Sequence, residues 1–355
     1  HVYSFSIFLV YTKYYTSSNP PYNEIVEKDS ENTGASKQLF PDFIMTSIKM
    51  KSDYVSLITP SRWFVGGEQA GYFPKLRSFL RENNHISKLI HYPNYKEIFD
   101  NVTIPGGVSY FLYDSTFTGQ IPFTNMRNNI AYTKIRNLFE EDLDIVLADD
   151  RLYSVIQKVK KDKFSSMMDI IGEWNSFGIV GKKEIIQAIS KTEPFENAVK
   201  VQCAYEEIRY TELKNVTKNI ERLKSWKVFT SKGNGGAGTL QDDKPVNIIG
   251  KSYVAEPNSV CTDSLIPVGC FNSKYESESC VKYMKTKFLR FMVGTLKVSQ
   301  NIYRNVYKFV PLQDFTENSD IDWKQNVADI DKQLYQKYGF QQDEIDYIEY
   351  IIKPM

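Results

Sequence analysis

The sequence has few of the residues that build metal sites and disulfide frameworks. Its 355 residues include only three histidines and four cysteines. The cysteines form no CxxC pair and the histidines show no HExxH spacing, so no zinc-ligand pattern is present. We therefore expect a reduced, cytoplasmic protein without a metal, in which Cys261, Cys270 and Cys280 are buried thiols.

An excess of charge and a long apolar run are also missing. Lysine and arginine total 44 against 43 acidic residues, so any surface that binds nucleic acid must be local. The opening run HVYSFSIFLVY is far shorter than the ~20 residues that span a bilayer, and it has no basic leader or cleavage site. We expect no membrane association, and we interpret the run as a buried strand of a domain whose beginning is absent.

Helical and strand patterns alternate between residues 43 and 113. FIMTSIKM and YFPKLRSFLREN place apolar residues at helical spacing, whereas YVSLITP and HISKLIHYP are typical of short strands. This alternation predicts an α/β fold with a doubly wound sheet. EIFDNVTIPGGVSYFLYD then gives two strand-like runs around Pro105-Gly106-Gly107, which predicts a hairpin and therefore a mixed sheet with an antiparallel edge.

The composition changes near residue 120, where TFTGQIPFTNMRNN is rich in Thr, Asn, Gly and Pro. A chain of this length commonly forms two domains, and we place them at 1–120 and 121–355. Beyond the boundary, helical segments and strand-like runs have no regular repeat, which favours an α+β fold. The helical segments are 136–160, 163–172, 183–190 and 213–225, followed by one helix in CVKYMKTKFLRFMVGTLKVSQN and another in DEIDYIEYIIKPM.

The motif Asn19-Pro20-Pro21-Tyr22 fits one specific chemistry. An exocyclic amine on an aromatic base is a weak nucleophile, because its lone pair is delocalised into the ring. The Asn19 side-chain oxygen and the Pro20 carbonyl can accept the two N–H bonds of such an amine, and the prolines fix φ so that both acceptors point one way. Tyr22 offers a stacking face worth about 1–3 kcal/mol, which offsets part of the cost of flipping a base out of duplex DNA.

The alternative for this motif is a polyproline turn before a helix. The context favours a site, because an apolar run precedes the motif and helices and strands follow it. Open α/β sheets bind their ligands at the carboxyl ends of the strands.

Several stretches together resemble one family. NPPY, taken with YVSLITPSRWFVGG, EIFDNVTIPGGVSYFLYD, AEPNSVCTDSLIPVGCFNS and YMKTKFLRFMVGTLKVSQNIYRNVYKFVPLQDF, is similar to the adenine-N6-specific DNA methyltransferases of bacterial type II (type IIG-like) restriction–modification systems. The resemblance covers nearly all of the chain from about residue 19. It implies a partial Rossmann-like methyltransferase domain, the carboxyl-terminal half of the catalytic domain, at 1–120, and a DNA target-recognition domain at 121–355. It also implies that Asn19, Pro20, Pro21 and Tyr22 are catalytic, that S-adenosylmethionine is the methyl donor and that double-stranded DNA is the partner.

A cofactor motif of that family has no counterpart before NPPY. Its members carry a Phe-x-Gly-x-Gly turn for the methionine part of the donor and an acidic residue for the ribose, whereas only 18 residues precede Asn19 here. We therefore expect the cofactor-binding half to be missing or supplied by another chain. GNGGAG at 233–238 is the downstream alternative, but a flexible loop that touches the DNA backbone is the more typical use of such a run.

Polar side chains of the second domain are candidates for contacts with DNA. Basic residues on the helix around 282–290 either track phosphates or form a solvated face, and an arginine or glutamine near 304–313 is a candidate for reading bases. The candidates are Lys232, Asn234, Lys282, Lys285, Lys287, Arg290, Arg304, Lys308 and Gln313. In the first domain, Arg62 or Trp63 either lines the active site or packs in a strand-end turn, and His85 and His91 are expected to be surface or core residues.

The leading interpretation is site-specific methylation of adenine N6 in duplex DNA as part of a restriction–modification system. One alternative keeps the motif and changes the substrate to a protein glutamine, but proteins of that kind lack a large domain after the hairpin. The other alternative is a truncated, non-catalytic subunit that recognises DNA without modifying it. The sequence does not indicate the recognition site.

Overall fold

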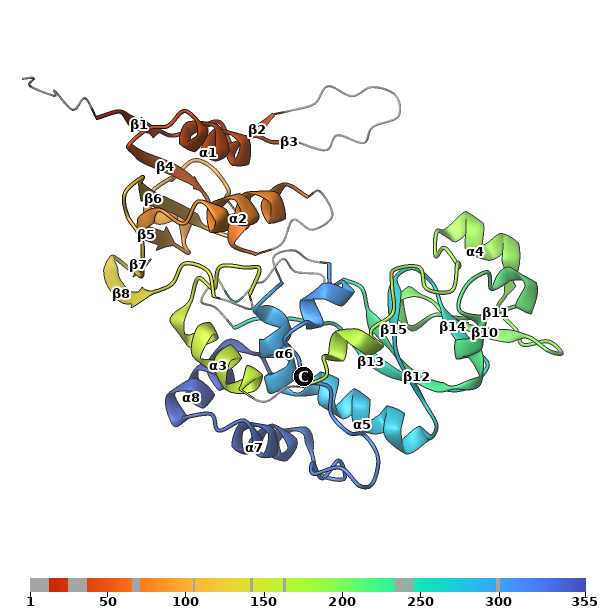
Figure 1. Ribbon diagram of the computed structural model, residues 1–355. Coiled ribbons are helices and arrows are strands. Elements are labelled where there is room, and N and C mark those ends of the chain that lie inside the picture. The colour runs from red at the N-terminus through yellow and green to blue at the C-terminus, as the bar shows by residue number, and fades with distance from the viewer. Residues whose placement is uncertain are drawn as a thin grey trace, which may run out of the picture. The chain divides into compact units, whose positions relative to one another are not determined.

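The chain divides into two compact units, residues 1–148 and 149–355, in the computed structural model (Figure 1). The structure describes residues 13–24, 37–65, 71–104, 106–140, 143–161, 164–233, 240, 245–297 and 301–355. Among the helices of these segments, none is both long and apolar enough to cross a membrane.

A six-stranded mixed sheet forms the centre of the first unit. Its strand order is β1-β4-β6-β5-β7-β8, in which β1 is parallel to β4, β5 is parallel to β7, and the other neighbours are antiparallel. The strands are β1 (Tyr15–Ser18), β4 (Tyr54–Pro60), β5 (Ile86–Tyr92), β6 (Val108–Asp114), β7 (Ile121–Arg127) and β8 (Ile130–Arg136). The mixed α/β sheet expected from the sequence is thereby confirmed.

Two helices, α1 (Phe40–Lys49) and α2 (Tyr72–Glu82), pack on one face of this sheet (Figure 1). Alternate residues of the strands, such as Leu57 on β4 and Phe111 on β6, meet apolar side chains of both helices in one buried cluster. Alternate residues of strands such as β4 are buried, and buried residues recur at helical spacing in α1 and α2, which agrees with the apolar pattern of the sequence. The remaining elements are a small ladder of β2 (Asn23–Glu24) with β3 (Lys37–Gln38), and the short helices η1 (Ser61–Phe64) and η2 (Tyr95–Glu97).

The hairpin expected around residues 105–107 is wrong. Strand β6 lies inside the sheet and pairs antiparallel with both β4 and β5, while residues 98–104 form no strand. Gly107 explains the path, because its φ of +78° suits glycine and a Cβ there would lie only 2.3 Å from the Tyr92 carbonyl oxygen. The chain therefore turns tightly against the end of β5, and the strand that follows, β6, lies between β4 and β5. The antiparallel edge is instead the β7–β8 hairpin.

The units separate later than the expected boundary near residue 120. Strands β7 and β8 pair with β5 and extend the first sheet, and Val146 N donates to the Phe64 carbonyl oxygen at 2.8 Å. Residues 121–148 therefore belong to the first unit.

The second unit mixes two small sheets with helices, as the α+β expectation requires. One sheet has the order β14-β10-β11-β9 and the other β13-β12-β15. Helix α5 packs on the second sheet and α6 contacts α5, α7 and α8. The strands are β9 (Ser190–Lys191), β10 (Val199–Gln202), β11 (Ile208–Thr211), β12 (Trp226–Ser231), β13 (Ser252–Ala255), β14 (Ser259–Cys261) and β15 (Leu265–Phe271); the α-helices are α3 (Asp150–Lys160), α4 (Lys183–Ile189), α5 (Lys274–Lys285), α6 (Lys287–Gly294), α7 (Val327–Lys337) and α8 (Gln342–Ile351). Five short 3-10 helices complete the described part: η3 (Met167–Ile170), η4 (Ala204–Glu206), η5 (Leu213–Asn215), η6 (Ile220–Lys224) and η8 (Arg304–Tyr307).

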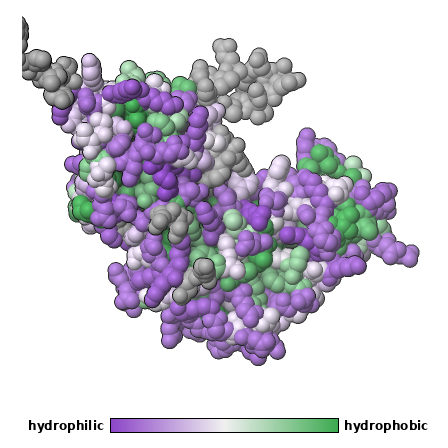
Figure 2. Space-filling model, viewed as in Figure 1, coloured by the Kyte–Doolittle hydropathy of each residue, from purple (hydrophilic) through white to green (hydrophobic). Residues whose placement is uncertain are grey.

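Three local expectations for this unit are wrong. The single helix expected in CVKYMKTKFLRFMVGTLKVSQN is two helices, because Thr286 is extended and its hydroxyl caps α6 by accepting from Leu289 N at 3.1 Å. The helices expected at 163–172 and 213–225 are short 3-10 turns. Cys270 is exposed, whereas Cys261 and Cys280 are buried as expected. Hydrophilic side chains cover most of the face shown in Figure 2, with small hydrophobic areas between them.

Candidate active site

The Asn19-Pro20-Pro21-Tyr22 segment begins directly after β1, at the carboxyl end of that strand. Because β1 is parallel to β4, with Ser18 opposite Leu57, the segment after β1 and the segment after β4 leave the sheet at the same edge. Helix η1 carries Ser61 and Trp63 into this edge. The carboxyl edge of parallel strands is where open α/β sheets bind ligands.

The motif alternates exposed and buried residues. Pro20 is buried, Asn19 and Pro21 are exposed, and Tyr22 is partly buried. The Tyr22 ring packs edge-on against Phe40, with centroids 6.4 Å apart, and its carbonyl oxygen accepts from Leu39 N at 3.0 Å. The start of α1 therefore anchors one end of the motif and β1 anchors the other, while the Asn19 carboxamide remains accessible.

The phenol of Tyr22 is the titratable group of the motif. Desolvation by burial raises the pKa of Tyr22 above its ordinary value, so the phenol stays neutral at physiological pH. Its hydroxyl oxygen is buried and has no hydrogen-bond partner among the described residues. A buried hydroxyl in this state is costly, and it can donate to an acceptor that enters the site.

Further buried polar atoms without a partner among the described residues lie beside the motif. Thr59 stands at the end of β4, opposite Ser109 of β6, and Ser61 begins η1. The hydroxyls of all three side chains and the indole nitrogen of Trp63 belong to this group. Trp63 itself is fully buried and packs edge-on against Phe64 at 4.7 Å, so the packing alternative holds for Trp63, while Arg62 is partly exposed.

Both described histidines have structural partners. His91 is buried, and its Nδ1 lies 3.0 Å from the Asn125 Oδ1, while the Asn125 amide donates to the Ala148 carbonyl oxygen at 2.7 Å. His85 Nδ1 lies 2.7 Å from the Phe117 carbonyl oxygen. These contacts agree with the expected structural role. No group of three or more His, Cys, Asp or Glu side chains in the described segments could hold a metal ion.

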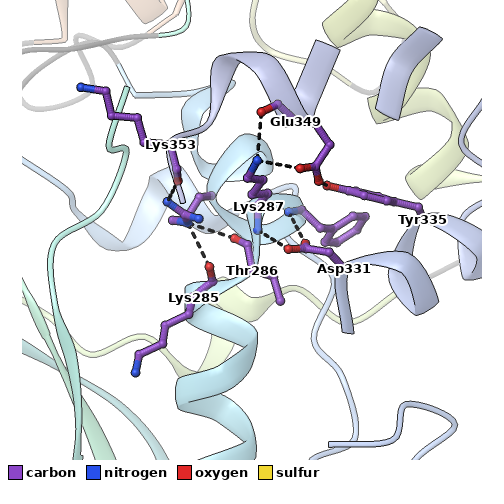
Figure 3. A network of polar contacts seen from close by, with 9 residues as sticks. Lys285, Thr286, Lys287, Asp331, Tyr335, Glu349 and Lys353 are labelled. Carbon is purple, nitrogen blue, oxygen red and sulfur yellow. Dashed lines mark hydrogen bonds and ion pairs between the residues drawn. The ribbon is translucent and has the colours of Figure 1, made fainter. Parts of the chain in front are cut away.

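The candidates for DNA contact on α5 and α6 are largely engaged within the protein (Figure 3). Arg290 is 1% exposed, and its guanidinium donates to the carbonyl oxygens of Lys285, Thr286 and Lys353 at 3.1, 3.1 and 2.7 Å. Lys287 Nζ binds Glu349 Oε2 at 2.6 Å. Arg290 is too deeply buried for direct contact with DNA, so the expectation that it tracks phosphates is corrected to a framework role.

The other candidates are scattered over the second unit. Gln313 is 5% exposed and bonds to Tyr338 Oη and Lys337 Nζ, both at 2.9 Å, which leaves it unable to reach a base. Lys282 Nζ binds the Trp323 carbonyl oxygen at 2.6 Å, while Lys285 remains partly exposed at the end of α5. Lys308 is partly exposed, and Asn234 lies outside the described residues. Lys232 and Arg304 both contact one turn: Lys232 lies over the ring of the exposed Trp174, and Arg304 pairs with Glu173.

Trp174 is a residue that the sequence patterns missed. It lies in a short polar stretch, GEWNS, that carries no motif and no amphipathic spacing. Its signal was the residue type alone, because a large aromatic side chain in a polar turn has no core to fill.

A site for S-adenosylmethionine is not complete among the described residues. The three positions after β1, β4 and β5 are Asn-Pro-Pro, Ser-Arg-Trp and Pro-Asn-Tyr, with no glycine-rich turn and no carboxylate for ribose hydroxyls. The glycine-containing segments 66–70 and 234–239, which include most of GNGGAG, lie outside the described residues. The described residues therefore do not by themselves fit the methyl donor.

The segment that carries the motif is similar to a known protein family. Residues 18–99, which span the NPPY motif, α1, β4, α2 and β5, match the family model of the Eco57I restriction-modification methylases. The predicted resemblance to restriction–modification methylases is confirmed for this segment.

A curated relative matches over 102 residues at 30% identity. It is an uncharacterized adenine-specific methylase of Mycoplasma pneumoniae, and the match covers 29% of this chain and 24% of the relative. The chain thus spans about a quarter of the curated relative that it matches.

Solved structures of restriction–modification enzymes are similar over larger parts of the chain but at low identity. The type IIL restriction-modification enzyme MmeI, in complex with DNA, matches at 9% identity and a TM-score of 0.46, over 95% of this chain and 56% of that one. The type IIG restriction endonuclease BpuSI matches at 10% identity and a TM-score of 0.35, over 90% of this chain and 48% of that one.

Proposed function

We propose that this chain supplies the base-binding part of an S-adenosylmethionine-dependent methyltransferase that modifies adenine N6 in duplex DNA within a restriction–modification system. The observation that carries the proposal is the geometry of the NPPY motif. Asn19 is exposed beside the buried Pro20 at the carboxyl edge of a parallel strand pair, and Tyr22 is anchored on Phe40 next to them.

In this proposal the motif activates the amine by binding its two hydrogens. The Asn19 side-chain oxygen and the Pro20 carbonyl oxygen each accept one N–H bond, which draws the nitrogen lone pair out of conjugation with the ring. Tyr22 supports the flipped base and offers its neutral hydroxyl as a donor. No group with a strongly shifted pKa is required, because the catalysis is positioning and electrostatic stabilisation.

S-adenosylmethionine would supply an electrophilic methyl group, and we propose that a part of the methyltransferase outside these 355 residues holds it. Calorimetric titration of the 355-residue chain with S-adenosylmethionine tests this division of labour. We expect no binding by the chain alone. Tight binding would show that the chain carries a complete donor site.

We further propose that the second unit recognises the DNA sequence. This function belongs to residues 149–355 rather than to 121–355, because the hairpin at 121–136 is part of the first sheet. A non-catalytic recognition subunit is the second candidate function, favoured by the incomplete donor site among the described residues.

Methyl transfer by the full-length protein separates the two candidates. Duplex DNA is incubated with S-adenosylmethionine that carries a labelled methyl group, and the nucleosides are separated after digestion. We expect label only in N6-methyldeoxyadenosine. Binding to DNA without transfer favours the recognition subunit, and label in another nucleoside contradicts the adenine assignment.

A further inference from the structure

Trp174 is the most exposed tryptophan of the chain's described segments. Its side chain is 52% exposed, whereas Trp63 and Trp323 are buried in the two units. Exposure of a large flat apolar surface costs free energy in water, so a ring held in this position is a candidate for contact with a partner.

The turn that carries Trp174 is held firmly on the second unit. The indole nitrogen donates to the Asp263 carbonyl oxygen at 3.2 Å, and Gly172 N donates to the Pro267 carbonyl oxygen of β15 at 2.8 Å. On the far side of the turn, the Asn219 amide donates to the Ser176 carbonyl oxygen at 2.5 Å. The ring is therefore pre-positioned, so a partner would not have to immobilise it on binding.

A positive charge lies directly over this ring. Lys232, at the end of β12, holds its ammonium 4.6 Å from the indole centroid, within the range of a cation–π contact. Backbone bonds fix the lysine: its N–H donates to the Ser264 carbonyl oxygen at 3.0 Å, and its own carbonyl oxygen accepts from Ile302 N at 2.7 Å.

The two nearby carboxylates bond to groups other than Lys232. Glu173 pairs with Arg304 at 3.1 Å, and the Arg304 Nε donates to the Met168 carbonyl oxygen at 2.9 Å. Asp263 Oδ1 accepts from Gly181 N at 2.8 Å. The formal charges of this group sum to zero, but neither carboxylate pairs with Lys232, whose ammonium lies next to the exposed ring.

We propose that Trp174 and Lys232 form a contact point for the backbone of duplex DNA, in which the ammonium pairs with a phosphate and the indole packs on the adjoining deoxyribose and base edge. This assignment rests on the proposed DNA-modifying function and adds to it a named element of the recognition unit. An ammonium and an aromatic face side by side match the alternation of charge and flat apolar surface along a nucleic-acid strand.

Binding of a fluorescein-labelled random-sequence 30-base-pair duplex tests the proposal, measured by anisotropy with the 355-residue chain from 50 to 200 mM NaCl. We compare the parent with Trp174→Leu, Trp174→Phe and Lys232→Gln. Lys214→Gln is the matched control, because Lys214 is an exposed lysine of the same unit that is paired with Glu212 at 2.7 Å. All three positions are exposed or partly exposed, so folding is checked by circular dichroism without an expected loss.

We expect Trp174→Leu to weaken binding by about tenfold and Trp174→Phe to restore most of the affinity, because stacking is worth about 1–3 kcal/mol. Lys232→Gln is expected to lower the slope of log Kd against log salt by about one unit, with no change in Lys214→Gln. DNA is also expected to protect the parent, but not Trp174→Phe, from iodide quenching of tryptophan fluorescence.

The outcomes distinguish this inference from the proposed function. If the parent binds DNA and the Trp174 and Lys232 variants bind equally well, the contact point is overturned and the proposed function stands. If the parent does not bind duplex DNA at any of these salt concentrations, both are overturned. Retained DNA affinity with protection of Trp174 by an added protein instead would assign the ring to a protein partner and also overturn the inference.

Discussion

Asp331 shows how burial and hydrogen bonding compete at a single carboxyl group. It is 4% exposed, and its two oxygens accept from Lys287 N at 3.0 Å and Phe288 N at 2.9 Å at the start of α6 (Figure 3). Desolvation raises the pKa of Asp331 to about 6, although these two bonds and the nearby Arg290 guanidinium act to lower it, while Glu349 acts to raise it. The raised pKa means that the ionised form is less favourable in the folded chain than in the unfolded one.

Stability should therefore depend on pH through this residue. Well below pH 4 the carboxyl is protonated in both the folded and the unfolded state, and well above pH 6 it is ionised in both. The free energy of unfolding should fall as pH rises between these values, by on the order of 3 kcal/mol, because each pKa unit is worth about 1.4 kcal/mol. Asp331→Asn should remove this dependence, measured by urea unfolding at pH 4 to 7.

Asp343→Asn is the matched control, because Asp343 is exposed in the first turn of α8. Its pH profile should follow that of the parent. An unchanged profile in Asp331→Asn would contradict the assigned cause.

At the scale of elements, Gly107 decides where β6 enters the sheet. A side chain there would meet the Tyr92 carbonyl oxygen at 2.3 Å and the Pro93 carbonyl oxygen at 2.8 Å, in a backbone conformation with φ of +78°. Gly71 has a similar φ of +70° before α2 but no heavy atom within 4 Å of an added Cβ. Alanine at Gly71 would therefore introduce backbone strain alone, whereas alanine at Gly107 would introduce both backbone strain and steric overlap.

Gly107→Ala should lower the free energy of unfolding of the first unit by about 2–4 kcal/mol. Gly71→Ala should lower it by about 1 kcal/mol. Thermal unfolding followed by circular dichroism measures both. Equal losses of stability in the two variants would contradict the steric cause, because they would mean that the backbone near Tyr92 shifts to make room for the added methyl group.

Most elements of the first unit could be predicted from the sequence, because hydrophobic periodicity is strong there. YVSLITP is β4 to the residue, and the expected helices overlap α1 and α2 closely. The position of β6 between β4 and β5 could not be predicted, since pairing with β4 joins segments about 50 residues apart and leaves no local pattern. The break at Thr286 was also missed, because one threonine within an apolar helical pattern gives no reliable stop signal.

For the candidate site, too, local patterns could be predicted from the sequence and contacts between distant residues could not. The NPPY motif is local, so its sequence alone indicated the chemistry and its place after a strand. Arg290 and Gln313 were selected by residue type, and sequence offers no means of knowing that carbonyl oxygens or Tyr338 already occupy their polar atoms. Trp174 became a candidate only when its exposure and its lysine neighbour were known.

At the scale of the whole molecule, the division at 148/149 predicts which fragment folds. A fragment of residues 149–355 keeps Asp149, whose carboxylate caps α3 by accepting from Arg151 N at 2.9 Å, and it keeps the ion pair of Lys158 with Glu344 at 2.6 Å. A fragment of residues 121–355 would carry β7 without its partner β5, with Ile121 and Phe123 exposed.

We expect 149–355 to be soluble and to unfold cooperatively, and 121–355 to aggregate more readily because the edge of β7 that pairs with β5 is left open. Size-exclusion chromatography and thermal unfolding compare the two fragments. Better behaviour of 121–355 would contradict the division of the units.

The central claim, that Asn19-Pro20-Pro21-Tyr22 binds the adenine amine, is tested most directly by a pair of asparagine variants. In a single-turnover assay of methyl transfer to duplex DNA, Asn19→Ala in the full-length protein should lower the rate by at least about 100-fold, the cost of losing one preorganised acceptor. Asn23→Ala, an exposed asparagine four residues later, should leave the rate within about threefold of the parent. A rate of N6-methyladenine formation that Asn19→Ala does not change, or that both variants lower equally, would contradict the account.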